Sequence, residues 1–125
     1  MGKVVFLSDD QEIIEEVSKK AEEEGYDIQT SNDKKEIIDR LKRRNIDMII
    51  VKTEDKESIS EIIKQVLDSG AKVLILSSDE NIIESIRKQY PKVETRRAQD
   101  KEEVKDAVEE FLKEGGSLEH HHHHH

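Results

Sequence analysis

One pattern recurs five times along the 125 residues of this chain: a short aliphatic run, a polar junction that ends in Asp, and a stretch with apolar residues at helical spacing. The junctions are Ser8-Asp9-Asp10, Ser31-Asn32-Asp33, Thr53-Glu54-Asp55, Ser77-Ser78-Asp79 and Ala98-Gln99-Asp100. Strands that alternate with helices of this length connect through right-handed crossovers into a parallel sheet covered on both faces. The repeat therefore predicts an α/β fold, a three-layer α/β/α sandwich of five strand–helix units around a five-stranded parallel sheet.

The spacing of apolar residues predicts where each element lies. Strands are expected at residues 3–8, 26–30, 47–52, 72–77 and 93–97. Helices are expected at about residues 10–24, 34–44, 56–69, 80–90 and 101–114. The buried face of the third helix should contain Ile59, Ile62, Ile63, Val66 and Leu67. Residues that suit the left-handed conformation at a helix end are Gly25, Asn45 and Gly70, and residue pairs with capping-box spacing are Asp33 with Glu36 and Asp100 with Glu103.

The polarity of the strands predicts their order in the sheet, because a strand covered on both faces is apolar throughout and an edge strand tolerates polar residues. The first, third and fourth predicted strands are nearly all apolar, whereas the second and fifth alternate with polar or charged residues. The flavodoxin-like order 2-1-3-4-5 puts these two strands at the edges, and the Rossmann order 3-2-1-4-5 does not. Other orders with the same edge strands, including those of some P-loop-like sheets, fit the pattern as well.

The length and composition limit what the chain can be. Residues 1–114 are enough for one domain with a single core, Gly115-Gly116-Ser117 looks like a spacer, and Leu118-Glu119 with six histidines at 120–125 looks like a purification tag. All six histidines lie in that tail and cysteine is absent, so the domain has no imidazole or thiolate for catalysis or metal binding.

The surface is predicted to be strongly charged, with 41% charged and 3% aromatic residues and a net charge of -9. Nucleic acid would be repelled and would find few rings on which to stack its bases. The longest apolar runs have four or five residues, far short of a membrane span. We expect a soluble protein without nucleic-acid, membrane or other partners, and the charged surface favours a monomer without forbidding a dimer.

The switch-point rule puts any ligand at the carboxyl ends of the first and third strands. The residues there are Ser8, Asp9, Asp10, Lys52, Thr53, Glu54 and Asp55. Asp9 and Asp10 are the candidates for a Mg²⁺ site, since Mg²⁺ takes one or two carboxylates and water. Both acids also suit the capping of a helix N-terminus, and equivalent acids recur at the other junctions. That recurrence favours capping, and the Lys52 ammonium would compete with a cation, so we predict no metal site.

Other motifs give no stronger signal. Neither G-x-G-x-x-G nor G-x-x-x-x-G-K-[ST] occurs, and Ser77 and Ser78 have no histidine or G-x-S-x-G turn to activate them. The basic cluster near the end of the second helix complements the helix dipole, and the basic pair on the fifth strand protects a sheet edge. These clusters are Arg40, Lys42, Arg43 and Arg44, and Arg96 and Arg97. We therefore predict no catalytic residue, no cofactor and no enzymatic activity.

Over nearly its whole length the chain resembles response-regulator receiver domains. Leu7-Ser8-Asp9-Asp10 is similar to their acidic pair, residues 47–51 to their third strand, and Ser77 to their hydroxyl residue. Lys52 stands where the family carries the phosphorylated Asp, and Arg97-Ala98 stands where a Lys-Pro pair is expected. The resemblance implies the fold and, as an alternative function, a receiver-like signalling domain that lacks the phosphoacceptor Asp and acts through protein–protein contacts.

Residues 3–114 also resemble computationally designed ideal α/β proteins. The shared features are short loops, capped helices, Ile/Val/Leu cores, and helix surfaces filled with Glu, Lys and Arg. This resemblance implies a de novo protein of flavodoxin-like topology with high stability. It would have no natural function or location, would be expressed recombinantly in the cytoplasm of a host, and would serve as a test of folding principles or as a scaffold.

Overall fold

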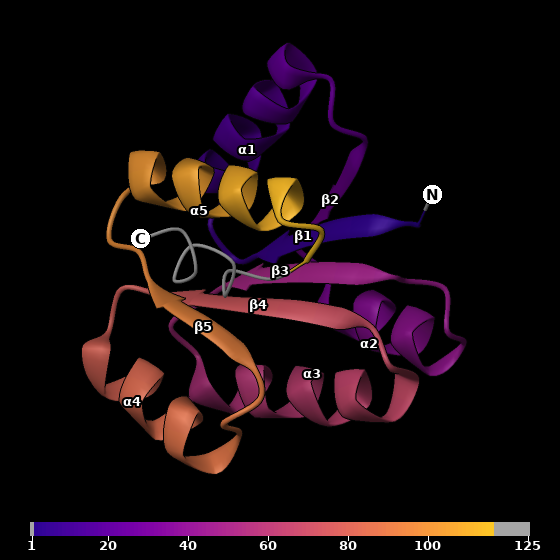
Figure 1. The fold of residues 1–125 in the computed structure, drawn as a ribbon, viewed down its shortest axis with the longest axis vertical. Coiled ribbons are helices and arrows are strands. Elements are labelled where there is room, and N and C mark those ends of the chain that lie inside the picture. Colours follow the sequence, from indigo (N-terminus) through magenta and orange to yellow (C-terminus); the bar gives the residue numbers. More distant parts are fainter. Residues whose placement is uncertain (1, 117–125) are drawn as a thin grey trace.

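Five strands and five helices alternate in the computed structural model, which describes residues 2–116 (Figure 1). The strands are β1 (Val4–Ser8), β2 (Ile28–Ser31), β3 (Met48–Lys52), β4 (Lys72–Ser77) and β5 (Glu94–Arg97). The helices are α1 (Gln11–Glu24), α2 (Lys34–Lys42), α3 (Lys56–Ser69), α4 (Glu80–Gln89) and α5 (Lys101–Lys113). The predicted tag and Ser117 of the predicted spacer lie outside the described residues.

The sheet is parallel throughout and its order is β2-β1-β3-β4-β5, which confirms the flavodoxin-like order predicted from edge polarity. The central strand β3 is in register with β1 from Val4↔Met48 to Ser8↔Lys52 and with β4 from Met48↔Lys72 to Lys52↔Leu76. Helices α1 and α5 cover one face of the sheet, and α2, α3 and α4 cover the other (Figure 1). The carboxyl ends of all five strands therefore lie along one side of the molecule.

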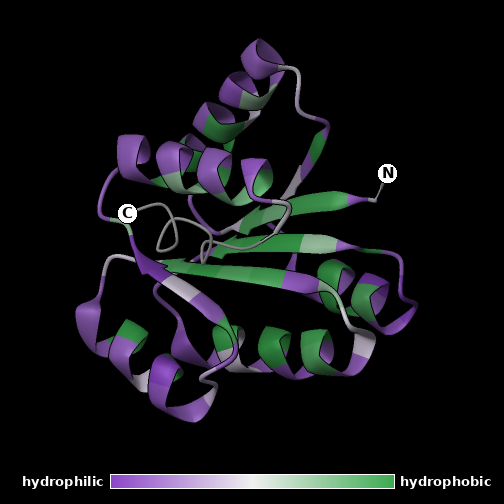
Figure 2. Cartoon of the chain, in the orientation of Figure 1, coloured by the Kyte–Doolittle hydropathy of each residue, from purple (hydrophilic) through white to green (hydrophobic). Residues whose placement is uncertain are grey.

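The core has one layer on each face of the sheet. Alternate residues of a strand point to opposite faces, so Ile49 of β3 packs with α2, α3 and α4, and its neighbour Ile50 packs with α1 and α5. Both side chains are fully buried. Figure 2 shows the same division in the helices, whose hydrophobic sides face the sheet and whose hydrophilic sides face outward. Within residues 2–116, no helix is long and apolar enough to cross a membrane.

The predicted buried face of α3 is correct for four of its five residues: Ile59, Ile62, Ile63 and Val66. Leu67 was the fifth, and that prediction is wrong, because its side chain is 59% exposed. Leu67 lies one position, or about 100° around a helix, from Val66. It therefore points past the margin of the packed stripe.

Each helix begins after an Asp in extended conformation whose carboxylate accepts hydrogen bonds from backbone N–H groups of the first turn. These caps are Asp10, Asp33, Asp55, Asp79 and Asp100. The predicted capping box at α5 is present in shifted form: Glu103 N–H donates to Asp100, and the Glu103 carboxylate accepts from the N–H of Gln99 instead of Asp100. At α2, the Glu36 N–H donates to Asp33.

The ends of the helices match two of three predictions. Gly25 and Gly70 have left-handed φ angles of 78° and 81°, as expected. At the end of α2 the left-handed residue is Arg44, with φ 57°, so the assignment to Asn45 is wrong. The helix ends at Lys42, two residues earlier than predicted, and the Asn45 N–H then closes the turn on the Arg40 carbonyl at 2.9 Å. Asn45 therefore lies one residue beyond the left-handed position.

Candidate functional site

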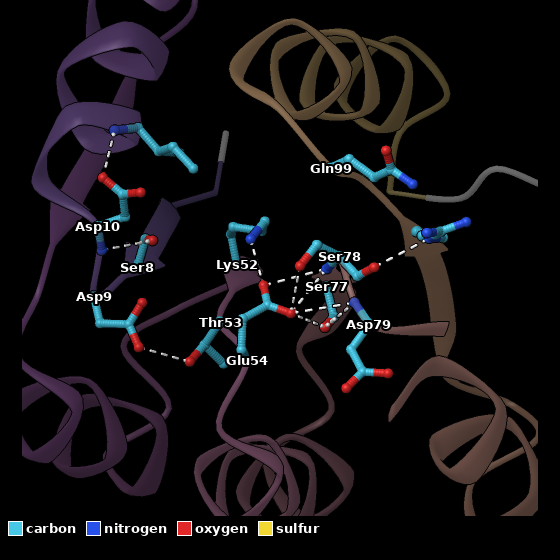
Figure 3. Close-up of polar contacts among 12 residues, drawn as sticks. Ser8, Asp9, Asp10, Lys52, Thr53, Glu54, Ser77, Ser78, Asp79 and Gln99 are labelled. Atoms are coloured by element: carbon cyan, nitrogen blue, oxygen red, sulfur yellow. Dashed lines mark hydrogen bonds and ion pairs between the residues drawn. The ribbon is translucent and has the colours of Figure 1, made fainter. Parts of the chain in front are cut away.

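The candidate site lies at the carboxyl ends of β1, β3 and β4 and in the loops that follow them (Figure 3). Of the residues that the switch-point rule selects, Ser8, Lys52 and Thr53 are buried. Asp9, Asp10, Glu54 and Asp55 are exposed. The candidate site therefore has exposed carboxylates at its surface, and two hydroxyl groups and one lysine are buried beneath them.

Four of the five junctions share one turn. The hydroxyl at the end of the strand region accepts a hydrogen bond from the backbone N–H two residues later, which belongs to the helix-capping Asp. The hydroxyls are those of Ser8, Ser31, Thr53 and Ser77, at distances of 3.1, 2.9, 3.1 and 3.2 Å. Such turns are the usual local role of Ser and Thr before a helix. The fifth junction has Ala98 at this position.

Asp9 and Asp10 have different partners. Asp10 caps α1, and its Oδ1 accepts from the N–H groups of Glu12 and Ile13 at 3.0 and 3.3 Å. Asp9 caps nothing, against the expectation from sequence; its Oδ2 accepts from the Thr53 hydroxyl at 2.9 Å and so joins the β1 and β3 loops. Within residues 2–116, no group of three or more His, Cys, Asp or Glu side chains is placed to hold a metal ion.

The densest polar cluster surrounds Glu54, whose carboxylate lies between the ends of β3 and β4 (Figure 3). The Lys52 ammonium donates to Oε2 at 2.5 Å, and the Ser77 hydroxyl donates to Oε1 at 2.6 Å. Ser78 donates to Oε1 through both its N–H and its hydroxyl at 2.9 Å, and the Asp79 N–H donates at 3.2 Å. Lys52 therefore forms its ion pair with Glu54.

These contacts set the ionisation of Glu54. Partial burial acts to raise its pKa, but the hydrogen bonds from Lys52, Ser77 and Ser78 outweigh that effect and lower the pKa from 4.5 to about 2. Nearby, the Ser58 hydroxyl lowers the pKa of Asp55. Glu54 is therefore ionised throughout the ordinary pH range, when it accepts hydrogen bonds and donates none.

Sequence reasoning did not single out this cluster. In the sequence, Glu54 is one of seven residues at the switch point, and Ser77 and Ser78 have no neighbouring group that would activate them. The partial signal in the sequence is that Lys52 and Glu54 flank Thr53 at the end of a central strand. The rest requires the pairing of β3 with β4, which brings the residues after Lys52 beside those after Leu76.

The basic residues have local contacts. Arg43 pairs with Asp39 at 2.8 Å, and the Arg40 Nε donates to the Asn45 side chain at 3.0 Å. On β5, Arg96 pairs with Glu110 of α5. The Arg97 Nε donates to the Ser78 carbonyl at 3.0 Å, which ties the end of β5 to the loop that binds Glu54.

Two hollows in the surface differ in size and place. The hollow at the switch point has a volume of about 60 Å³ and is lined by Ser8, Asp9, Asn32, Lys34, Thr53 and Ser58, among others. A larger hollow of about 510 Å³ lies at the opposite, amino-terminal side of the sheet, with Tyr26, Ile28, Met48 and Leu112 in its wall. Sites for drug-sized ligands usually measure about 300–1,000 Å³, so the switch point itself holds little more than water.

The strand order and the two helix layers define a flavodoxin-like α/β protein, the class that includes receiver domains. No model of a known protein family and no curated protein matches the chain. A response-regulator receiver domain from Methanospirillum hungatei JF-1 is similar, with a TM-score of 0.68 and 15% identity over 91% of this chain and 95% of that chain. At this identity the likeness shows a shared fold alone.

Two solution NMR structures of de novo designed proteins of P-loop NTPase fold match over 98% or more of the chain. One has a TM-score of 0.67 and 30% identity, and covers 98% of this chain and 99% of that chain. The other has a TM-score of 0.64 and 26% identity, and covers all of both chains. The chain therefore belongs to the de novo designed α/β proteins, and the resemblance recognised from its sequence is confirmed.

Proposed function

We propose that this protein is a stable designed scaffold, made to test how an α/β sequence specifies its fold, and that it has no biochemical activity of its own. The observation that carries the proposal is the engagement of Glu54. At the side of the sheet where α/β proteins bind their ligands, this carboxylate is held by five donor groups of the same chain. Polar groups that bind one another in this way stabilise loops instead of receiving a substrate.

The chemistry of the cluster supports the same proposal. A hydroxyl nucleophile needs a general base whose pKa lies near the working pH. The Ser77 hydroxyl donates to Glu54, whose pKa is lowered to about 2, so this carboxylate is too weak a base to activate the serine at neutral pH. Asp9 and Asp10 are engaged with Thr53 and with the N-terminus of α1.

The test is guanidinium unfolding of the full chain, followed by circular dichroism, with and without millimolar Mg²⁺. We expect a midpoint above about 5 M, the level of idealised designs, and no change with Mg²⁺. The control is Asp9→Asn, which keeps an oxygen acceptor for Thr53 and removes one carboxylate of the candidate pair.

A midpoint that rises with Mg²⁺ in the wild type and not in Asp9→Asn would show that the native state binds the ion. The proposal would then fail, and the receiver-like alternative would lead. A low midpoint without a Mg²⁺ effect would contradict the stable-scaffold proposal and leave the acidic pair without a metal.

A further inference from the structure

The donors around Glu54 come from separate parts of the chain and converge on one carboxylate (Figure 3). The Lys52 ammonium lies at the end of β3, the Ser77 hydroxyl at the end of β4, and the Ser78 and Asp79 N–H groups just before α4. Backbone N–H groups at a helix N-terminus, joined by hydroxyls and a cation, are the arrangement by which proteins bind anions. The geometry is therefore that of an anion site with an anion in it.

Lys52 distinguishes this cluster from an ordinary helix N-terminus. Its side chain is only 9% exposed, and its ammonium points at the Glu54 carboxylate. A buried ammonium without a counter-anion is strongly unfavourable, because it has lost its hydration and gained no partner. Whenever Glu54 is absent, Lys52 therefore favours another anion in the same place.

We propose that these five donors form a binding site for small monoanionic carboxylates, and that Glu54 occupies this site as a ligand supplied by the chain itself. The tethered carboxylate excludes free anions, because a short tether gives it a high effective concentration. The charge of the surroundings selects a monoanion: Asp79 lies at the rim, and the net charge of -9 disfavours a dianion such as phosphate.

The substitution Glu54→Ala opens the site. It removes one methylene and the carboxylate, which together have the size of acetate, and it leaves all five donors in place. Acetate is therefore the matched probe. It should stabilise this variant by binding the folded state, and at ten times its dissociation constant it should lower the ratio of unfolded to folded protein about elevenfold.

The measurement is urea unfolding of the full chain at pH 7 in sodium acetate and in sodium chloride of equal ionic strength. The wild type should respond equally to both salts, and so should Glu54→Gln, whose side chain still fills the site. Glu61→Ala is the matched surface control, because it removes a carboxylate of α3 that is bound to Lys34 at 3.0 Å but to no backbone N–H. Only Glu54→Ala should show an acetate-specific shift.

Two further readouts place the acetate. In ¹H–¹⁵N spectra of Glu54→Ala, the amide signals of Ser78 and Asp79 should move with acetate and saturate, and the double variant Glu54→Ala/Lys52→Met should lose that response. If Glu54→Ala is unfolded without acetate, recovery of its helical circular dichroism signal serves as the titration. The proposal would be overturned if chloride stabilised Glu54→Ala as much as acetate does, or if acetate stabilised Glu61→Ala equally. It would also be overturned if the amide signals of Ser78 and Asp79 did not move, or if acetate did not refold a Glu54→Ala variant that is unfolded without it.

Discussion

At the scale of single residues, Glu54 has the most strongly lowered pKa among the described residues. Its pKa of about 2 in the folded state lies below the value of 4.5 expected for a free glutamate, so the folded state favours the ionised form. This contribution to stability is fully present above about pH 4.5 and is lost as the pH falls from 4.5 toward 2. Below that range Glu54 is protonated in both states.

The substitution Glu54→Gln should therefore have a pH-dependent cost. Glutamine keeps the size of the side chain but loses the charge that pairs with Lys52. We expect the wild type to be more stable than the variant at pH 7, and we expect this difference to shrink between pH 4.5 and 2. Urea unfolding of both proteins across this range measures it, with Glu84→Gln as the control, because it removes an exposed carboxylate of α4 that pairs with Arg87 at 3.7 Å. A difference that stays constant with pH would contradict the assignment.

Ser77 and Ser8 allow a second comparison at this scale, because both are buried and both accept the N–H of the helix-capping Asp two residues later. Ser77 alone of the two also donates to Glu54. A net hydrogen bond is worth about 1 kcal/mol, and more when one partner is charged. Ser77→Ala should therefore cost about 1–2 kcal/mol more than Ser8→Ala in urea unfolding at pH 7. Equal losses would mean that the bond to Glu54 adds nothing.

At the scale of helices and strands, sequence patterns predicted what depends on neighbours along the chain. Alternating polarity identified the edge strands, and the recurring Asp identified the helix starts. The patterns failed where the outcome depends on packing. Leu67 continues the apolar stripe of α3 but meets no covering element, and Glu54 finds its donors only because β3 pairs with β4. Neither contact can be seen in a local stretch of sequence.

The end of α2 allows a test of which residue is left-handed: Asn45, as the sequence predicts, or Arg44, as the structure has it. Arg44 has φ 57°, a conformation that costs a side-chain-bearing residue about 1 kcal/mol and that glycine adopts freely. Arg44→Gly should therefore stabilise the protein by about 0.5–1 kcal/mol in urea unfolding. Asn45→Gly should be neutral or destabilising, since it loses the hydrogen bond from Arg40. Stabilisation by Asn45→Gly alone would restore the assignment made from sequence.

At the scale of the whole molecule, the sheet couples the two core layers. Ile49 and Ile50 are adjacent in β3 and belong to opposite core layers. If β3 loses its packing against one layer, its packing against the other layer is therefore disturbed as well. A chain built in this way should unfold in one transition, as small single domains do. A single transition would support the single domain that the length of the chain predicts over residues 1–114.

The test removes side-chain volume on one face and observes the other. Ile50→Ala deletes a fully buried side chain in the layer of α1 and α5 and should cost about 2–5 kcal/mol. Tyr90 packs against the layer of α2, α3 and α4, and in a Tyr26→Phe background it is the only tyrosine of a chain without tryptophan. Its fluorescence and the far-ultraviolet circular dichroism should shift to the same lower midpoint, whereas Leu67→Ala should move neither by much. If Tyr90 kept the original midpoint, the two faces would unfold separately and the chain would comprise two cooperative units instead of one.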